Sequence, residues 1–504
     1  MDPEASSVPS DAQRIDVGGR TVMPGFIDAH SHMEMIAYAW GIAVDIKPPA
    51  ARSIDDIVAI LAEKARKTPA DQWILGQGMH YQDQHMTDGR YPNRHDLDRV
   101  STDHPVVARF SFHMNVFNTK ALEILGVDEN TTDMEGGFLE RDEQGRPTGM
   151  TLDMWHALNA PDWPYPDLGP ALLDAQKSYL SHGVTALTEF TLFRGGVDAF
   201  LEMERRDELM IRVSLYPKVP HVCSIADAVD GTFSRRFEEA DPARLRLGGM
   251  KLFIDGGLTS RAAAMHEPYW GTDIRGDLAF EPEEFACIVK LLHEAGHQIA
   301  VHAIGDRAQD VVLDAFEALS HRKGKNGAPH RIEHAGNSLW EGSRSARFKA
   351  GEILPVPQPP FIHTTAAGYR KSLGPTRGKS VFPMRRMLLE QGFAVPGNSD
   401  AIGIHPLQHA PLFGIWAMVT RIMNNGEKLN DGQEIDVATA LKMYTRYAAR
   451  SVGREHEIGS LEPGKYADFV VFDRSPLEVP ADDLRDMAPA EAWINGERVF
   501  ARDN

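Results

Sequence analysis

The feature that most constrains this chain is a repeated alternation of short apolar runs with segments of helical periodicity. Helical periodicity is clear, for example, at 283–296 and 307–320. Such alternation is typical of parallel strands joined by helices. The runs that predict strands lie at 22–32, 183–192, 212–219, 246–256, 297–306, 330–336, 352–361 and 392–400. Eight strand–helix units predict an α/β protein built as a (β/α)8 TIM barrel.

A long interval between the first two predicted strands interrupts this alternation. Within it, 53–67 has helical periodicity, 104–112 is β-like and 136–149 resembles a polar hairpin. We therefore predict an inserted α+β subdomain at 45–168 that covers the open end of the barrel. Near the C-terminus, 458–473 and 492–501 predict two strands with a turn between them, packed on the outside of the barrel.

The charge balance excludes several partners. The chain has 53 basic and 72 acidic side chains and a net charge of −19, which disfavours nucleic acid and anionic lipid as partners.

No run of apolar residues approaches the length of a membrane span. The acidic, polar first residues do not resemble a secretion signal, and Cys223 and Cys287 are the only cysteines. We therefore expect a cytoplasmic protein with a small-molecule substrate, and a homodimer is the default expectation.

His30 and His32 are the first candidate metal ligands. They are two positions apart at the end of the first predicted strand, so their side chains share one face. Two imidazoles at this spacing can bind one divalent ion. Taken alone the pair is weak support for a site, because two solvated or hydrogen-bonded histidines are the more common explanation of such a pair.

Three later strands also end in a potential ligand. His302 ends one apolar run, His334 ends the next, and Asp400 ends the eighth. In a parallel barrel, the carboxyl ends of all strands meet at one opening. Imidazole and carboxylate are suitable ligands for zinc or a similar ion. The recurrence in barrel order predicts a metal site of one or two ions.

Lys251 lies inside the apolar run MKLFIDG, where a charged ammonium is costly to bury. One interpretation is a lysine of lowered pKa that reacts with CO2 to form a carbamate, an anionic ligand able to bridge two cations. The other is an ion pair with Asp255, which shares its strand face.

The motifs FIDAHSH, MKLFIDGGL, VHAIGD, RIEHA and NSD resemble those of the amidohydrolase superfamily, and the closer resemblance is to its N-substituted formamide deformylase branch. DGGLTSRAAAMHEPY at 255–269 matches that branch, as do His113 and Asn118 in FHMNVFNTKAL. The segment from Tyr444 to Asp473 matches its C-terminal motif. The resemblance covers nearly the whole chain.

The resemblance implies a division into three parts. These are a small β-sandwich from 1–22 and 456–504, a metal-dependent hydrolase barrel from 23–44 and 169–455, and the insert at 45–168. The family has several strands before its HxH motif, whereas here few residues precede it, so either the N-terminal part of the sandwich is reduced or a segment that precedes this sequence is missing from it. The chain also departs from the family at Met79 and His80, where the family has a tryptophan and an acidic residue.

The resemblance also implies roles for the candidate ligands. His30 and His32 would hold one metal ion together with Asp400, and a carboxylated Lys251 would bridge to a second ion held by His302 and His334. Zinc is the expected metal. Metal-bound hydroxide would attack the carbonyl carbon of a linear amide or N-substituted formamide, cleaving a non-peptide C–N bond, while Asp400 shuttles the proton to the leaving amine.

Several residues are candidates for substrate contact. His113 is expected to donate to the carbonyl oxygen or anchor the substrate, with a structural role as the alternative, and Asn118 is its partner in the insert. Arg261 is expected to contact a polar substrate or form a local salt bridge. Gln358 lies near a predicted strand end and is expected to line the pocket. Trp73 of the insert fits an apolar substituent or the subdomain core.

Other functions fit the same ligands. A ring-amidine deaminase uses the HxH, His, His and Asp set with one metal and no bridging lysine, and a cyclic amide or ester hydrolase uses the same site. A non-enzymatic metal-binding scaffold would lack a water-activating base. Lys251 distinguishes the first alternative from the linear-amide hydrolase.

Overall fold

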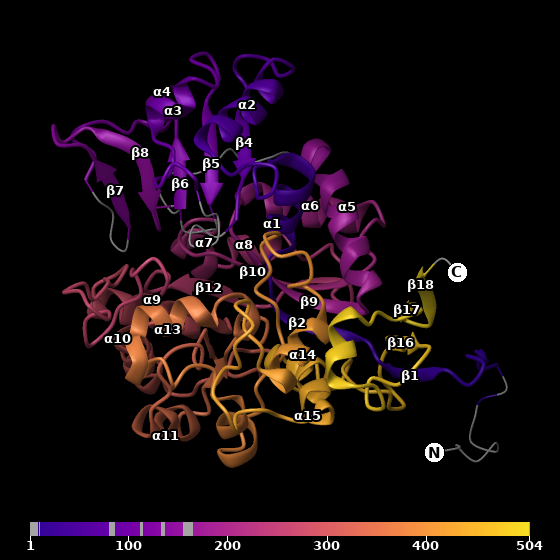
Figure 1. The fold of residues 1–504 in the computed structure, drawn as a ribbon. Helices are drawn as coiled ribbons and strands as arrows, with labels where there is room; N and C mark the ends of the chain where they lie inside the picture. The colour runs from indigo at the N-terminus through magenta and orange to yellow at the C-terminus, as the bar shows by residue number, and fades with distance from the viewer. Residues whose placement is uncertain are drawn as a thin grey trace.

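The computed structural model describes residues 9, 11–79, 86–110, 114–132, 137–154 and 165–502. Figure 1 shows three regions: a central α/β part, a mixed sheet that stands above it, and a small antiparallel sheet at its side. The protein has an α/β fold, as predicted.

The central part contains two parallel four-stranded sheets. The first has the order β11-β10-β9-β2, and the second has the order β12-β13-β14-β15. Most of these strands are buried along their whole length, which explains their continuous apolar runs. The bounds are β2 (Phe26–Ser31), β9 (Val184–Thr191), β10 (Arg212–Pro217), β11 (Leu245–Leu247), β12 (Met250–Phe253), β13 (Ile299–His302), β14 (Arg331–Glu333) and β15 (Leu354–Val356).

The predicted strand at 246–256 is divided into β11 and β12. Gly248 and Gly249 lie between the two strands, and a Cβ at either position would collide with the ring of Tyr216. The break therefore lets the chain pass closely over a neighbouring strand. A hydrogen bond from Val219 N–H, just after β10, to the Lys251 carbonyl in β12, 2.8 Å long, links the two sheets.

The eighth predicted strand, 392–400, does not form a regular strand. The segment runs beside β2, with hydrogen bonds from Ala29 N–H to the Gly397 carbonyl (3.1 Å) and from Asp400 N–H to the His30 carbonyl (2.7 Å). A longer ladder cannot form because Pro396 has no N–H and Asp400 turns into the left-handed region at φ 48°. The prediction of a regular eighth strand was wrong, and closure of the barrel stays a prediction.

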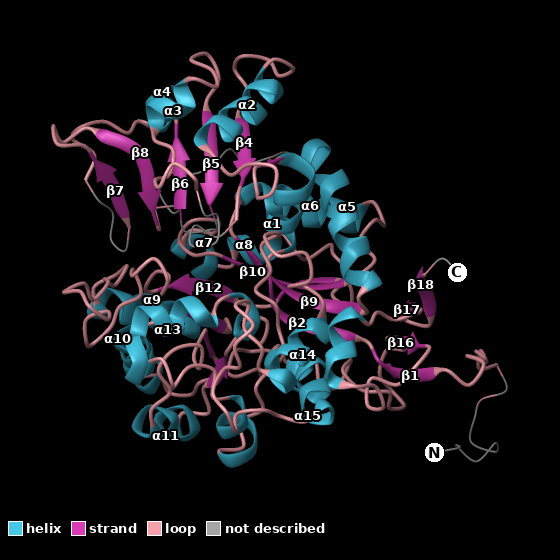
Figure 2. Cartoon of the chain, in the orientation of Figure 1, coloured by secondary structure: helices cyan, strands magenta, loops and turns pink. Residues whose placement is uncertain are grey.

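Helices follow the strands along the outside of the central part (Figure 2). The predicted helices at 283–296 and 307–320 are confirmed as α9 and α10. The helices of this part are α1 (Met33–Ala37), η1 (Tyr38–Ile42), α5 (Tyr165–Ser181), α6 (Arg194–Arg205), α7 (Ile225–Val229), α8 (Thr232–Arg235), α9 (Pro282–Glu294), α10 (Asp306–Glu317), α11 (Gly342–Ala350), α12 (Phe361–Thr364), α13 (Ala366–Arg377), η2 (Arg386–Glu390), α14 (Pro411–Thr420), α15 (Val437–Lys442), η3 (Met443–Tyr447), α16 (Ala448–Ser451) and η4 (Ala481–Asp486).

The mixed sheet of the insert has the order β3-β4-β5-β6-β8-β7. Its helix α2 begins at a capping box in which Ser53 and Asp56 satisfy each other's backbone N–H groups. The expected hairpin is present as the antiparallel pair β7 and β8. The elements are β3 (Val44–Asp45), α2 (Ile54–Ala65), β4 (Ile74–Gln77), α3 (Arg94–Asp98), β5 (Val106–Phe110), β6 (Met114–Phe117), α4 (Thr119–Leu125), β7 (Phe138–Arg141) and β8 (Pro147–Leu152).

The two ends of the chain meet in one antiparallel sheet of order β1-β16-β17-β18. The segment 492–501 is a hairpin instead of a single strand, because Asn495 and Gly496 both adopt positive φ (54° and 77°), as a tight hairpin turn requires. The described residues form one sheet here, so a sandwich stays a prediction. The strands are β1 (Thr21–Pro24), β16 (Phe469–Phe472), β17 (Glu491–Ile494) and β18 (Glu497–Ala501).

No helix in the described ranges is both long enough and apolar enough to cross a bilayer. The main core cluster joins residues of the parallel sheets to their covering helices, while the insert has apolar clusters of its own around α2 and β4. The strand ends are therefore held on a packed scaffold, which fixes the positions of the side chains discussed next.

Candidate metal centre

The six predicted ligands all line one cavity of about 370 Å³. His30 and His32 come from the end of β2, Lys251 from β12 and His302 from the end of β13, while His334 follows β14 and Asp400 follows the segment beside β2. The ring centroids of His30 and His334 are 5.4 Å apart, and those of His302 and His334 are 4.4 Å apart. Separate strands, most of them at their carboxyl ends, thus bring the six side chains to one place.

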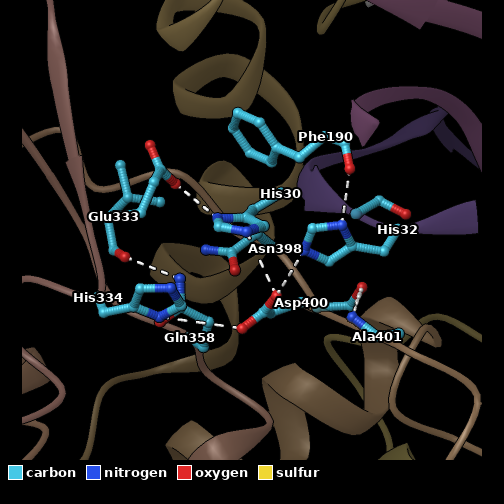
Figure 3. A network of polar contacts seen from close by, with 12 residues as sticks. His30, His32, Phe190, Glu333, His334, Gln358, Asn398, Asp400 and Ala401 are labelled. Atoms are coloured by element: carbon cyan, nitrogen blue, oxygen red, sulfur yellow. Dashed lines mark hydrogen bonds and ion pairs between the residues drawn. The ribbon is translucent and has the colours of Figure 1, made fainter. Parts of the chain in front are cut away.

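His30, His32 and Asp400 form the tightest group. One ligand atom from each lies within 4.8 Å of the others. The Asp400 Oδ1 atom lies 3.1 Å from His32 Nε2 and 3.3 Å from His30 Nε2 (Figure 3). Burial alone would raise the pKa of Asp400, but the neighbouring His30 and His32 hold it well below its usual range. An ionised carboxylate between two imidazoles is a suitable donor set for a divalent cation.

Hydrogen bonds fix which nitrogen of each imidazole faces Asp400. The Nδ1 of His30 lies 2.6 Å from Glu333 Oε2, and the Nδ1 of His32 lies 2.8 Å from the Phe190 carbonyl oxygen (Figure 3). Both acceptors require a proton on Nδ1, so Nε2 is left as the lone-pair donor. Burial lowers the pKa of His32, which favours the neutral form that binds metal.

His302 and His334 form a second pair beside this group. The Nδ1 of His334 donates to Gln358 Oε1 at 2.7 Å, which again leaves Nε2 for a cation. Burial lowers the pKa of His334 to about 3, so this ring is neutral over the physiological range. His302 stacks on Phe253 with ring centroids 4.7 Å apart, and its Nε2 lies 3.7 Å from Asp255 Oδ1.

Lys251 is fully buried between the two groups of imidazoles. Within the described ranges its Nζ has no hydrogen-bond partner, and it lies 4.3 Å and 4.9 Å from the ring centres of Phe190 and Phe253. The carboxylate of Asp255 instead accepts three backbone N–H groups, so the alternative interpretation of a Lys251–Asp255 ion pair is not supported. Burial lowers the pKa of Lys251 to about 8, which raises the fraction of neutral amine.

Two of these residues adopt a strained backbone. His334 has φ 71° and Asp400 has φ 48°, a region that costs a non-glycine residue about 1–3 kcal/mol. In both cases the turn at the end of an extended segment aims the side chain into the cavity. Strain at two candidate ligands favours a functional reason for their positions over a purely structural one.

The candidate substrate contacts mostly lie elsewhere. Asn118 is fully buried, and its amide accepts from Val106 and Ala121 N–H and donates to the Ser101 and His104 carbonyls. All of its hydrogen-bonding capacity is therefore used inside the insert, and the expectation of a substrate contact is corrected to a structural role.

The other candidate substrate contacts also differ in whether they reach the cavity. Trp73 packs against an apolar cluster of the insert, and Arg261 is exposed; neither lines the described cavity wall. Gln358 is completely buried and reaches the site only through His334, so it is a positioning residue. His113 lies outside the described residues. Met79 is a residue of the insert that does line the cavity.

Sequence reasoning missed the buried residues that hold the ligands. Glu333 accepts from both Arg331 and His30, and Glu189 accepts the Met33 and Glu34 N–H groups at the start of α1, directly after His32. The alternation Arg331–Glu333 within a buried strand was a usable signal, because two opposite charges on one strand face predict an ion pair.

Replacing Gln358 with leucine should lower the affinity of the site for a divalent ion by about 10- to 100-fold. The substitution removes the acceptor that fixes the protonated nitrogen of His334. The measurement is a Zn²⁺ titration against a competing chelator. Gln391→Leu is the control, since it removes an amide that bonds Trp340 instead of a ligand. Equal Zn²⁺ affinities for the two variants would contradict this role.

Comparisons with known proteins agree with the geometry. A model of the amidohydrolase family matches residues 13–500. The chain is 28% identical to the N-substituted formamide deformylase of Arthrobacter pascens, over 98% of this chain and 90% of that protein. It is 30% identical to the putative amidohydrolase YtcJ of Bacillus subtilis (strain 168), over 98% and 91%. The crystal structure of an uncharacterized metal-dependent hydrolase from Pyrococcus horikoshii OT3 superimposes with a TM-score of 0.72 at 28% identity, covering 93% of this chain and 89% of that one.

Buried imidazoles and a carboxylate gathered at the ends of parallel strands, together with these relatives, define an enzyme of the metal-dependent hydrolase class. The chain belongs to the amidohydrolase family. The resemblance predicted from its motifs is thereby confirmed, as is the assignment of an enzyme that hydrolyses C–N bonds.

Proposed function

We propose that this enzyme hydrolyses the C–N bond of a linear amide of the N-substituted formamide class. The observation that carries the proposal is the convergence of His30, His32 and Asp400 with Lys251 in one cavity. The name of the Arthrobacter pascens relative supports the substrate class. Much of the remaining wall is apolar, including Leu192, Phe253, Ile304 and Ile402, which suits an apolar substituent on the amide nitrogen.

The donor set fits divalent ions, which we propose to be zinc. His30, His32 and Asp400 would hold one ion, His302 and His334 would hold a second, and Lys251 would bridge them. For this the neutral Lys251 Nζ forms a bond to the carbon of CO2 and loses a proton, leaving an N-linked carbamate. Ions bound there would polarise the substrate and lower the pKa of water to about 7. The Lys251 Nζ is buried and has no hydrogen-bond partner among the described residues. This modification would turn it into a metal ligand.

Asp400 is the residue we assign to proton transfer. Its carboxylate is ionised, because the neighbouring imidazoles hold its pKa well below the usual range, and it can accept the proton that the attacking water loses. Delivery of that proton to the amide nitrogen makes the amine a competent leaving group. The Nε2 atoms of His30 and His32 lie 3.3 Å and 3.1 Å from its Oδ1, close enough for the three atoms to share one cation.

The surrounding architecture is proposed on the same basis. The two parallel sheets and the segment at 392–400 would close into the (β/α)8 barrel of 23–44 and 169–455, with the insert 45–168 over its mouth. The terminal sheet would represent the sandwich of 1–22 and 456–504. Met79 at the cavity wall supports a covering role for the insert.

Metal counting combined with a substrate panel tests the function. We expect purified enzyme to hold more than one Zn²⁺ per chain, to hydrolyse N-substituted formamides, and to lose activity on chelation and regain it with Zn²⁺. Lys251→Ala should lower both the metal content and kcat, because the bridging ligand is lost. A single ion unaffected by Lys251→Ala, together with turnover of a ring amidine but not of formamides, would overturn the proposal in favour of a deaminase.

A further inference from the structure

A second pair of histidines lines the same cavity and is not used by the metal centre. His363 lies in α12, after β15, and His405 lies in the segment between Asp400 and α14. Their ring centroids are 6.1 Å apart.

Backbone hydrogen bonds give the two rings opposite hydrogen-bonding characters. The Nδ1 of His363 lies 2.9 Å from the Ile422 carbonyl; a carbonyl only accepts, so the proton is on Nδ1 and Nε2 is an acceptor. The Nδ1 of His405 accepts the Leu407 N–H at 3.3 Å, so in the neutral ring its proton is on Nε2. Within the described residues neither Nε2 has a hydrogen-bond partner. The two rings, with centroids 6.1 Å apart in the cavity wall, therefore offer one acceptor and one donor.

The surroundings hold both rings in place and keep them uncharged. His405 stacks on Phe413 with centroids 4.9 Å apart, and His363 packs edge-on against Trp416 at 5.0 Å. Burial lowers the pKa of His363 and lowers that of His405 to about 4, so neither imidazole is a cation at neutral pH. An anionic group would meet no positive partner on these rings and would face the Nε2 lone pair of His363.

We propose that His363 and His405 form a recognition site for a neutral group that both donates and accepts hydrogen bonds, such as a primary carboxamide, carried by the substrate away from the bond that is cleaved. This inference rests on the proposed function, because it assumes that the cavity holds an amide substrate. A hydrocarbon at the same place would leave both Nε2 atoms unsatisfied, which costs binding free energy. The pair would therefore set specificity without taking part in the chemistry.

Three matched probes test this site on the Zn²⁺-loaded enzyme. They are the N-formyl derivatives of ω-aminohexanamide, of ω-aminohexanoate, and of the branched hydrocarbon amine in which an isopropyl group replaces the carboxamide. We expect kcat/KM for the carboxamide probe to exceed that for either of the others by about tenfold. Calorimetric affinities of the three probes for the Asp400→Asn enzyme, in which turnover is expected to be slow, provide a second readout.

Two variants and a control test whether His363 and His405 cause the preference for the carboxamide probe. His405→Phe preserves stacking on Phe413 and His363→Phe preserves the contact with Trp416, and each should bring the carboxamide-to-hydrocarbon ratio close to unity. His221→Phe, in another partly buried histidine that does not line the cavity, should keep the wild-type ratio. Thermal unfolding of each variant shows whether it is folded, and the two single variants are independent tests of the same pair.

Different results would overturn the recognition site and the proposed function. Hydrolysis of all three formamides at similar kcat/KM would overturn the recognition site and leave the proposed function in place. No hydrolysis of any formamide would overturn the proposed function, and the calorimetric ranking would then decide the site. A preference for the carboxylate probe would also overturn the recognition site. So would a wild-type carboxamide-to-hydrocarbon ratio in both His363→Phe and His405→Phe.

Discussion

Replacing Asp400 with asparagine is expected to lower kcat about 10²- to 10⁴-fold, the range that a positioned acid–base group contributes. An asparagine amide has nearly the same shape but cannot accept the proton of the attacking water. In the native protein the carboxylate lies 3.1 Å from His32 Nε2 and 3.3 Å from His30 Nε2. These neighbours lower the pKa of Asp400 against the effect of burial, so the native group is charged and ready to accept a proton.

Steady-state kinetics on an N-substituted formamide, with metal content measured on the same samples, provide the test. The metal content separates loss of proton transfer from loss of a ligand, because Asp400 serves both roles in the proposed site. Asp486→Asn, at an exposed aspartate in η4, is the matched control and should leave kcat unchanged. An Asp400→Asn enzyme that retains most of the wild-type kcat would contradict the assignment.

Replacing Glu333 with glutamine should affect both stability and metal affinity. Glu333 and Arg331 are completely buried, and the carboxylate lies against both the Arg331 guanidinium and His30 Nδ1. Removing its charge leaves Arg331 without a compensating anion, which costs about 3–5 kcal/mol of unfolding free energy for a buried pair. It also weakens the hydrogen bond that keeps the proton of His30 on Nδ1, so Zn²⁺ affinity should fall about 10- to 100-fold.

Urea unfolding and competitive Zn²⁺ titration measure these two effects separately. Unfolding is compared in metal-free samples, because bound metal adds its own stabilisation. Glu497→Gln, at an exposed residue of β18, is the control and should change neither quantity. Wild-type Zn²⁺ affinity in Glu333→Gln would show that the carboxylate serves only to neutralise Arg331.

The candidate metal ligands could be predicted from the sequence because each prediction depends on a local pattern. His30 and His32 share a strand face by simple alternation. His302, His334 and Asp400 follow apolar runs, and parallel topology then brings the strand ends together. The charge and size of Lys251 within an apolar run marked it as unusual, although the run alone did not distinguish a ligand from a partner of Asp255.

The substrate contacts could not be predicted in the same way, because side-chain partners depend on how the chain folds around each residue and not on a hydrophobic pattern. The Asn118 amide is used by backbone groups of the insert, and Gln358 reaches the site through His334. The donor and acceptor character of His363 and His405 depends on Ile422 and Leu407. None of these contacts produces a repeating pattern in the sequence from which it could be predicted.

By itself, the sequence determined the α/β class, most of the parallel strands and the residues that end them, because hydrophobic alternation acts within a few neighbouring residues. Only the tertiary structure decided which nitrogen each imidazole presents, which carboxylates hold the ligands, and which polar groups face the cavity. Those properties come from hydrogen bonds that form only in the folded chain, such as His30 with Glu333, 303 positions apart, and His334 with Gln358, 24 positions apart.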